Sequence, residues 1–248
     1  MTDARLAARL AVGAGELLLE LRATPGLTGK ELGARGDAES NAYLLRELAA
    51  ARPDDAVLSE ESADSPARLA SRRVWIVDPL DGTREFAMAG RSDWAVHVAL
   101  WEAGRGIAAA AVAQPALRAV YASDDVRAVR VARERPVIVV SDGRPPGFAP
   151  AVAATIGADL VPMGSAGAKA MAVVRGEADA YLHAGGQWEW DSAAPVGVAA
   201  AAGLHASRLS GSPLEYNQPR PYLPDLLICR PELAHRLIQA VIGWRPRQ

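Results

Sequence analysis

Apolar residues recur at helical spacing in two stretches near the N-terminus. In residues 3–22 the leucines fall on one side of a helix and the charged residues on the other. Residues 37–51 repeat this pattern. The segment 25–36 between them is rich in glycine and is predicted to be a loop or a hairpin. The chain is therefore expected to begin with two amphipathic helices.

The pattern then changes to that of buried strands. Residues 73–77 form a short apolar run, and residues 94–101 alternate or run apolar. Further along, strand-like and helix-like segments follow one another without an internal repeat. The predicted strands are 73–77, 94–101, 106–112, 117–121, 136–140, 178–182 and 225–229, and the later predicted helices are 166–175, 192–202 and 231–242.

Together these patterns predict an α/β protein of layered helices and sheets. An α+β subdomain that binds metal is expected over residues 1–132, and an α/β subdomain that completes the active site over residues 133–248. The charged stretch 130–135, just before a new strand, places the boundary. A chain of 248 residues is long enough to bury a substantial core without disulfides or a structural metal.

Composition argues against several classes of function. With 27 Lys and Arg against 29 Asp and Glu, and no basic tract, the chain is not expected to bind a polymeric nucleic acid. Cys229 is the only cysteine, so an internal disulfide is excluded. Charged residues interrupt the first 21 positions, so neither a signal peptide nor a membrane span is predicted. A cytoplasmic protein that does not bind membranes is expected.

One predicted strand ends at an aspartate that is followed at once by proline. Pro79 has no N–H group and fixes its own φ, so the chain is predicted to leave the strand and turn there. The turn would bring Asp78 and Asp81 to one side of the backbone. Adjacent carboxylates repel each other unless a cation offsets the repulsion, and Mg2+ prefers oxygen ligands, including backbone carbonyls such as that of Leu80. The turn is therefore a predicted magnesium site.

The next two residues favour phosphate binding. Gly82 allows the backbone to approach a ligand closely, and Thr83 offers an N–H and a hydroxyl at the expected start of a helix, where phosphate binds well. Taken alone, Asp-Pro-x-Asp-Gly is also the composition of an ordinary surface turn. Other acidic residues of the chain decide between a metal-binding turn and an ordinary surface turn.

Two further acidic blocks accompany this turn. Glu60 and Glu61 precede it by about one strand and one loop, and Asp191 follows far downstream, before an alanine-rich segment. In these three blocks, present in the same order, the chain resembles the inositol monophosphatase-like superfamily of metal-dependent phosphatases over roughly residues 1–230. The resemblance implies the layered αβαβα sandwich of the sugar phosphatases, Mg2+-dependent hydrolysis of a small phosphate monoester, a homodimer and inhibition by lithium.

The resemblance also implies which residues bind metal. Two or three Mg2+ ions per active site are expected, and Asp78 would bridge two of them. Glu60 and the carbonyl of Leu80 would complete the ligands of the first ion, and Asp81 and Asp191 those of the second. A water activated by metal can then attack the phosphate, so no covalent nucleophile is required.

A second pair of residues is expected to orient that water. Asp37 matches the upstream aspartate that pairs, in the superfamily, with the threonine numbered Thr83 here, so the predicted catalytic residues are Asp37, Glu60 and Thr83. Other interpretations stay open. Asp37 and Asp191 are also suitable as helix N-caps, and Glu60 and Glu61 as a solvated strand end, which is the preferred interpretation for Glu61.

Residues 164–169 superficially resemble a phosphate-binding loop, but their spacing does not fit that of nucleoside triphosphatases. The resemblance implies instead that they open a helix beside the active site, where the first N–H groups contact substrate and Lys169 pairs with a second phosphate. A surface lysine lying over alanines is the alternative. The predicted substrate-binding residues are Gly82, Thr83, Gly164, Ser165 and Lys169.

Finer features indicate a branch of the superfamily. Arg84-Glu85-Phe86 and Lys169 are similar to the CysQ branch, the 3'-phosphoadenosine 5'-phosphate phosphatases, whereas Ala184 stands where inositol phosphatases carry an acidic residue. The expected reaction is removal of the 3'-phosphate from 3'-phosphoadenosine 5'-phosphate to give AMP, with 3'-phosphoadenosine 5'-phosphosulfate as a further candidate substrate, in sulfate assimilation. Residues 184–188 depart from both branches, so the pocket for the nucleobase is not readable from the sequence.

Alternatives to this reaction stay open at this point. An inositol-1-phosphate or fructose-1,6-bisphosphate phosphatase is the alternative within the superfamily, and a catalytically silent metal-binding interaction protein is the alternative from another class. The histidines His97, His183, His205 and His235 lack the spacing of zinc ligands, and each is predicted to be a packing or surface residue outside the mechanism.

Overall fold

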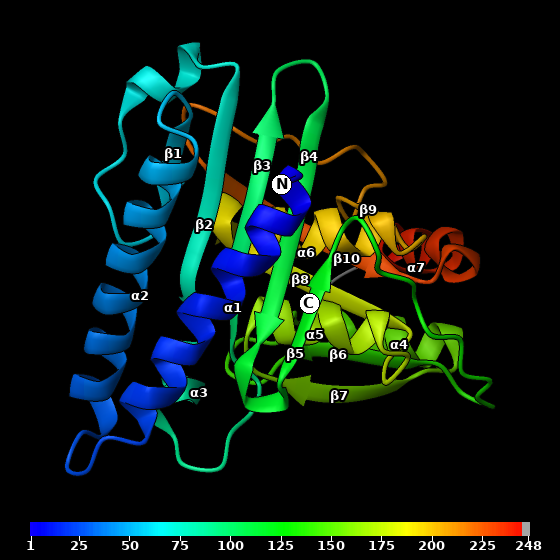
Figure 1. The fold of residues 1–248 in the computed structure, drawn as a ribbon. Helices are drawn as coiled ribbons and strands as arrows, with labels where there is room; N and C mark the ends of the chain where they lie inside the picture. Colours follow the sequence, from blue (N-terminus) through cyan, green and yellow to red (C-terminus); the bar gives the residue numbers. More distant parts are fainter. Residues whose placement is uncertain (245–248) are drawn as a thin grey trace.

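Two five-stranded sheets form the centre of the computed structural model, which describes residues 1–244 (Figure 1). The first sheet has the order β1-β2-β3-β4-β5, and the second has the order β7-β6-β8-β10-β9. In the first sheet these strands are β1 (Ala56–Ser59), β2 (Arg73–Asp81), β3 (Ala95–Glu102), β4 (Gly106–Gln114) and β5 (Ala119–Ala122). In the second they are β6 (Val137–Ser141), β7 (Asp159–Met163), β8 (Ala180–Trp188), β9 (His205–Ser207) and β10 (Tyr222–Cys229).

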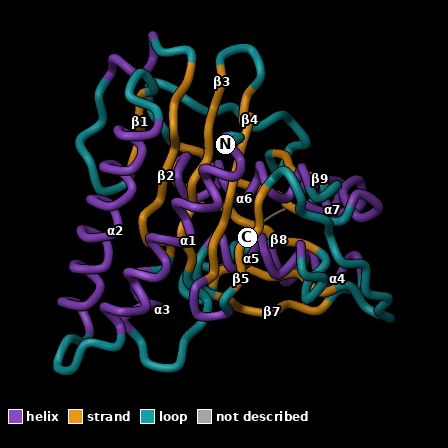
Figure 2. Tube along the Cα trace, viewed as in Figure 1, coloured by secondary structure: helices purple, strands orange, loops and turns teal. Residues whose placement is uncertain are grey.

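Helices separate and cover the two sheets. Helices α1 and α2 lie on one face of the first sheet, α5 and α6 lie between the sheets, and α4 and α7 cover the outer face of the second (Figures 1 and 2). The helices are α1 (Asp3–Arg22), α2 (Gly29–Ala51), α3 (Thr83–Ala87), α4 (Ala149–Ile156), α5 (Ala166–Val174), α6 (Glu189–Ala201) and α7 (Pro231–Gly243). This order of layers confirms the predicted αβαβα sandwich.

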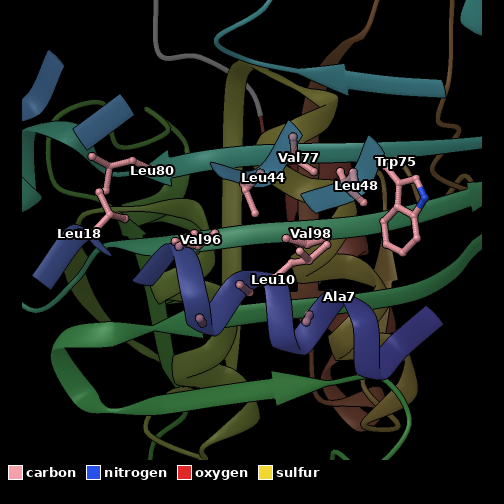
Figure 3. Packing of buried hydrophobic residues seen from close by; sticks show 14 of the residues in the cluster. Ala7, Leu10, Leu18, Leu44, Leu48, Trp75, Val77, Leu80, Val96 and Val98 are labelled. Carbon is pink, nitrogen blue, oxygen red and sulfur yellow. The ribbon is translucent and has the colours of Figure 1, made fainter. Parts of the chain in front are cut away.

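The N-terminal helices form as the apolar pattern predicts. Leu10 of α1 and Leu44 of α2 are fully buried, and they pack with Val98 and the other inward-facing residues of β2 and β3 in one apolar cluster (Figure 3). Burial of this kind stabilises a helix far more than intrinsic propensity does. It also fixes α2 along β2, beside the residues that carry the candidate chemistry.

The predicted loop over residues 25–36 is wrong from Gly29 onward, because α2 begins there. Two of the glycines that suggested a loop lie on the helix face that contacts the rest of the protein. A Cβ atom on Gly36 would lie 2.9 Å from both the Leu80 and Phe86 side chains, and one on Gly33 would lie 2.8 Å from Thr83. These glycines therefore allow α2 to approach the end of β2 closely.

The predicted end of β2 at Asp78 needs a correction. Asp78 pairs with His97 and Asp81 pairs with Ala95, with a register shift between the two pairs. The strand therefore bulges at Pro79 and then rejoins the ladder, and a bulge is one of the few places where a strand inside a sheet accepts proline.

The second half of the chain contains elements that the sequence did not predict. The later predicted helices and strands are present with ends shifted by a few residues, but α4, β7 and β9 were missed, as was β1 near the N-terminus. Helix α4 has eight almost wholly apolar residues, so it shows no polar face at helical spacing. The predicted subdomain boundary near residue 132 falls between β5 and β6 and stays a prediction, and the last four residues of the second predicted subdomain lie outside the described residues. Among residues 1–244, no helix is both long and apolar enough to cross a membrane.

The close contact of α2 with β2 leads to a prediction about stability. Replacing Gly36→Val should lower the free energy of unfolding by about 1–3 kcal/mol, because the new side chain overlaps Leu80 and Phe86. Urea denaturation measures this change. Ala49→Val, at an exposed position of the same helix, is the matched control and should cost less than about 0.7 kcal/mol. Equal losses in the two variants would show that close packing at Gly36 does not matter.

Candidate active site

Three of the predicted metal ligands converge at the end of β2. Asp78 and Asp81 belong to β2, and Asp191 is the third residue of α6. One carboxylate oxygen of each lies within 4.8 Å of the others. Asp78 is fully buried and Asp81 nearly so. The bulge at Pro79 allows two side chains three positions apart on β2 to reach the same point.

Glu60 joins these three carboxylates from the neighbouring strand. Strand β1 runs parallel to β2, and the Glu60 N–H donates to the carbonyl of Val77 at 3.4 Å. The Glu60 side chain lies beside Asp78, and the residue is exposed at the edge of the cluster. We call Glu60, Asp78, Asp81 and Asp191 the acidic cluster.

Two helix-cap interpretations from the sequence are wrong. Asp37 lies in the interior of α2, eight residues after its first residue. The N-cap of α6 is Trp188, whose N–H donates to Asp191 Oδ2 at 2.5 Å. Asp191 therefore accepts a hydrogen bond from the cap residue while its carboxylate remains part of the acidic cluster.

Burial and mutual repulsion raise the pKa values of most of the acidic cluster. Burial, followed by the charges of Glu60, Asp81 and Asp191, raises the pKa of Asp78 well above its ordinary value. Burial and the Asp191 charge raise the pKa of Glu60 to about 7, and burial and the Asp81 charge raise the pKa of Asp191 to about 6. Asp78 Oδ2 has no hydrogen-bond partner within the described part of the chain. A cation is the natural partner for such a cluster.

Asp81 is the exception in the cluster. Burial acts to raise the pKa of Asp81, but the charge of His97 and the hydrogen bonds to its carboxylate hold it below its ordinary value. His97 Nε2 lies 3.2 Å from Asp81 Oδ2, the Ser165 hydroxyl donates to Oδ2, and the N–H groups of Ala166 and Gly167 donate at 3.1 and 2.7 Å. The N-terminus of α5 therefore binds the Asp81 carboxylate.

The contacts of His97 with the site were not predicted from the sequence. This residue was predicted to be a packing or surface residue, and it is buried, but its ring also contacts Asp81 on one side and the carbonyl of Trp190 on the other, at 3.1 Å. The pairing of two adjacent strands puts it directly opposite Asp78. This strand pairing is the signal that could have identified His97 as a site residue. It can be used only when the register of β2 and β3 is known.

The structure also brings together the predicted pair that orients water. Thr83 Oγ1 donates to Asp37 Oδ1 at 3.0 Å and lies 3.3 Å from the Leu80 carbonyl. Burial, with a smaller contribution from the charge of Glu61, raises the pKa of Asp37 to about 6. Gly82 precedes Thr83 with φ +90°, a left-handed conformation that glycine adopts readily.

The start of α5 is arranged differently from the prediction for substrate contacts. Lys169 is buried, so the alternative of a surface lysine is wrong. Its Nζ donates to the carbonyls of Met163, Gly164 and Ser165 at 3.3, 3.2 and 2.6 Å. In this arrangement the ammonium group holds the turn before α5, and its predicted contact with a second phosphate stays a prediction.

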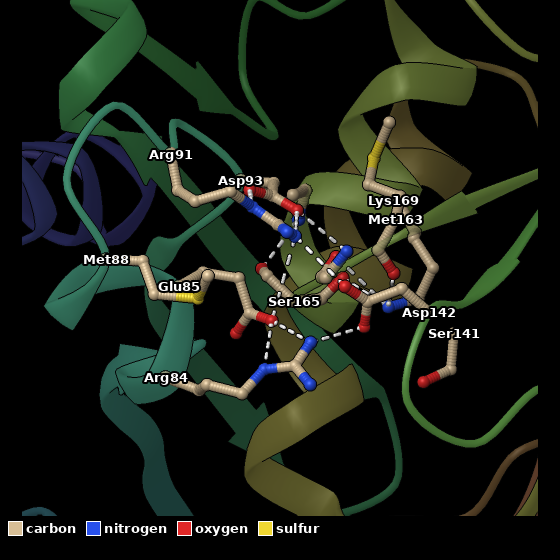
Figure 4. Close-up of polar contacts among 12 residues, drawn as sticks. Arg84, Glu85, Met88, Arg91, Asp93, Ser141, Asp142, Met163, Ser165 and Lys169 are labelled. Atoms are coloured by element: carbon tan, nitrogen blue, oxygen red, sulfur yellow. Dashed lines mark hydrogen bonds and ion pairs between the residues drawn. The ribbon is translucent and has the colours of Figure 1, made fainter.

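A network of ion pairs connects this turn to the first sheet (Figure 4). Arg91 pairs with Asp93 and, at 3.1 Å, with Asp142 after β6, while Arg84 of α3 pairs with Asp142 at 2.6 Å. Asp93 Oδ2 in turn accepts the N–H of Gly164 at 2.8 Å. The network therefore fixes the N-terminus of α5 relative to the turn after β2.

A cavity of about 470 Å³ opens over the acidic cluster. The sequence predicted part of its lining, namely Glu60, Asp81, Gly82, Ser165, Lys169 and Asp191. It did not predict the far wall, which includes Ser141, Arg144, Tyr181, His183, Gln187, Trp188 and Tyr222. A larger groove of about 1150 Å³ lies by β4 and α6, but the acidic cluster does not line it.

The acidic cluster fits Mg2+ by the chemistry of its donors. Its side chains supply only hard carboxylate oxygens, which Mg2+ prefers. The carbonyl of Leu80, which lies between Asp78 and Asp81 in the sequence and 3.3 Å from Thr83 Oγ1, is a further candidate oxygen. The unpartnered Oδ2 of Asp78 is a buried acceptor that a cation would satisfy.

Comparison with known proteins identifies relatives along nearly the whole chain. The model of the inositol monophosphatase family matches residues 3–143 and 140–242. The 3'-phosphoadenosine 5'-phosphate phosphatase of Mycobacterium leprae is 55% identical, over 97% of this chain and 94% of its own. The 3'(2'),5'-bisphosphate nucleotidase CysQ of Escherichia coli is 31% identical, over 75% of this chain and 80% of its own. Among solved structures, CysQ of Bacteroides thetaiotaomicron is similar with a TM-score of 0.78 at 23% identity, over 92% of this chain and 97% of that one.

The uncompensated negative charge of the acidic cluster should lower the melting temperature of the metal-free protein. Asp78→Asn should raise the melting temperature of the metal-free protein at pH 7 by about 2 °C or more, because asparagine removes a carboxyl group whose pKa is raised in the folded state. The gain should shrink as the pH falls and vanish below about pH 3, where aspartate carries a proton in both the folded and the unfolded chain. Thermal unfolding with and without Mg2+ measures both effects.

The same experiment distinguishes a metal site from a local charge effect. Mg2+ should raise the melting temperature of the wild type and of the control Asp54→Asn, an exposed substitution away from the cluster, but not that of Asp78→Asn. Equal stabilisation of all three proteins by Mg2+ would contradict metal binding at this cluster.

Proposed function

The chain belongs to the inositol monophosphatase family, and we propose from this premise that it removes the 3'-phosphate of 3'-phosphoadenosine 5'-phosphate to give AMP. It is a phosphoric monoester hydrolase. The observation that carries the proposal is the convergence of the acidic cluster with the Asp37–Thr83 pair, in a chain 55% identical to a phosphatase of this name. 3'-Phosphoadenosine 5'-phosphosulfate is a further proposed substrate.

The acidic cluster is proposed to hold Mg2+ ions. Glu60, Asp78 and the Leu80 carbonyl would hold one ion, and Asp78 would share a second with Asp81 and Asp191. Bound Mg2+ supplies charge neutralisation on the phosphate and lowers the pKa of a coordinated water. The protein contributes the rigid placement of these oxygens, since the Asp81 carboxylate is already bound by His97 and the N-terminus of α5.

The Asp37–Thr83 pair is proposed to orient the attacking water. Because Thr83 donates its hydroxyl proton to Asp37, the Thr83 oxygen is left as an acceptor for a proton of the water. Glu60 stands on the open side of the cluster and is the second proposed acceptor. The phosphate is proposed to bind at the N–H groups of Gly82 and Thr83, which begin α3 and so have no partner within the helix.

The proposed role of the 164–169 segment follows from its contacts. Ser165 donates to Asp81 and lines the cavity on the side of the proposed second metal. Gly164, just before it, is tied to the ion-pair network through its N–H group. Lys169 lines the same cavity and is proposed to act on a second phosphate by its charge. A homodimer, a cytoplasmic location and lithium inhibition stay predictions of the family resemblance.

A comparison of substrates tests the proposed reaction. With Mg2+, kcat/KM should be higher for 3'-phosphoadenosine 5'-phosphate than for inositol 1-phosphate or fructose 1,6-bisphosphate by at least about tenfold, as expected when a site rejects analogues that leave its polar groups unpaired. Phosphate release is the measurement. A preference for either sugar ester would overturn the substrate, and the absence of Mg2+-dependent release from all three would favour a silent metal-binding protein.

The Asp37–Thr83 pair gives a second test within the site. Asp37→Asn should lower kcat by about 10²–10⁴ with little change in KM, because proper positioning of the water matters in the transition state. Glu61→Gln, which alters a carboxylate next to Glu60 that is predicted to be solvated, is the matched control and should retain nearly full activity. Similar losses in both variants would count against the special role of Asp37.

A further inference from the structure

The far wall of the cavity carries two exposed aromatic side chains. Trp188, at the end of β8, is 41% exposed, and Tyr222, at the start of β10, is 39% exposed. The two residues are paired across the β8–β10 ladder, and both line the cavity that holds the acidic cluster. Large aromatic surface left open to solvent beside a polar site is typical of ligand binding.

These rings are held in place before any ligand arrives. Trp188 stacks on Trp190, with ring centroids 5.5 Å apart and planes 17° apart, and it meets Tyr222 edge-to-face at 5.7 Å. The Arg220 guanidinium lies 5.0 Å from the centre of the Tyr222 ring. We call Trp188 and Tyr222, with Trp190 behind them, the aromatic wall.

A glycine in the backbone of β8 leaves room for the Tyr222 side chain of the aromatic wall. A Cβ atom on Gly186 would lie 2.1 Å from the Tyr222 hydroxyl, so only glycine leaves room for the tyrosine in this position. Gly185 and Gly186 also have φ values of +97° and +91°. Residues 184–188, which the sequence left without an interpretation, therefore build one side of the cavity.

The aromatic wall is tied directly to the acidic cluster. The Trp188 N–H donates to Asp191 Oδ2 at 2.5 Å, and the two residues lie within one turn at the start of α6. Trp188 also lines the same cavity as Glu60, Asp81 and Asp191, so a ligand whose phosphate lies at the acidic cluster has its remaining atoms within reach of the Trp188 ring. The occupant that suits this arrangement is planar at one end and carries a phosphate at the other.

We propose that the aromatic wall is the surface on which the nucleobase of the substrate stacks, with Trp188 as the main contact. This inference rests on the proposed function and specifies which part of the nucleotide the far wall recognises. Stacking on an aromatic side chain tolerates any base, since every base offers a flat π face. The aromatic wall therefore selects nucleotides over polyol phosphates without selecting one base.

Substrates with and without a base test the proposal. Trp188→Ala should lower kcat/KM about ten- to a hundredfold for 3'-phosphoadenosine 5'-phosphate, and equally for its guanosine counterpart. It should leave hydrolysis of ribose 3,5-bisphosphate, which lacks a base, unchanged within about threefold. Trp188→Tyr, which keeps an aromatic ring, should restore most of the loss. Leu117→Ala, at a position of similar exposure far from this cavity, is the control and should match the wild type.

The outcomes separate this inference from the proposed function. An equal loss on the base-free substrate, or full activity of Trp188→Ala on both nucleotides, would overturn the aromatic wall as a base site. If the wild type hydrolysed none of these compounds, the proposed function would fail, and titration calorimetry with AMP would decide the inference separately. AMP should then bind the wild type more tightly than Trp188→Ala by about tenfold or more, and equal affinities would overturn it.

Discussion

The mutual repulsion of carboxylates crowded into one buried place is the constraint on which the rest of this structure depends. One carboxylate oxygen each of Asp78, Asp81 and Asp191 lies within 4.8 Å of the others, in a place where burial already disfavours their charged forms. The protein offsets this repulsion most strongly at Asp81, which His97 and the N-terminus of α5 bind. The remaining negative charge is left for a cation, and a bound cation would supply positive charge that can neutralise a phosphate.

Packing away from the cluster keeps these side chains from moving apart. Helix α2 contacts the end of β2 through glycines, which places Asp37 beside Thr83, and α6 lies between the sheets, which places Asp191. The ion pairs of Arg84 and Arg91 attach the start of α5 to the same region. Each element that supplies a polar group to the cavity is therefore also a layer of the sandwich or is tied to one.

The sequence predicted the local parts of this arrangement better than the distant ones. The apolar patterns gave both N-terminal helices and most strands, and the proline after Asp78 was enough to expect that Asp78 and Asp81 approach each other. The start of α2 was wrong because glycine at a helix contact and glycine in a loop look alike in a single sequence. The contacts of His97 and Lys169 were not predictable, because they depend on strand register and on a turn that the chain reaches only after folding. The aromatic wall could not be predicted for the same reason. It pairs residues from β8 and β10 that are 34 positions apart.

The ion-pair network has a consequence for how small molecules enter and leave. Because Asp142 after β6 is bound to arginines from the segment between β2 and β3, moving the two sheets apart at this edge would break several ion pairs at once. Entry past the exposed side chains of Trp188 and Tyr222, which line the cavity, needs no such break.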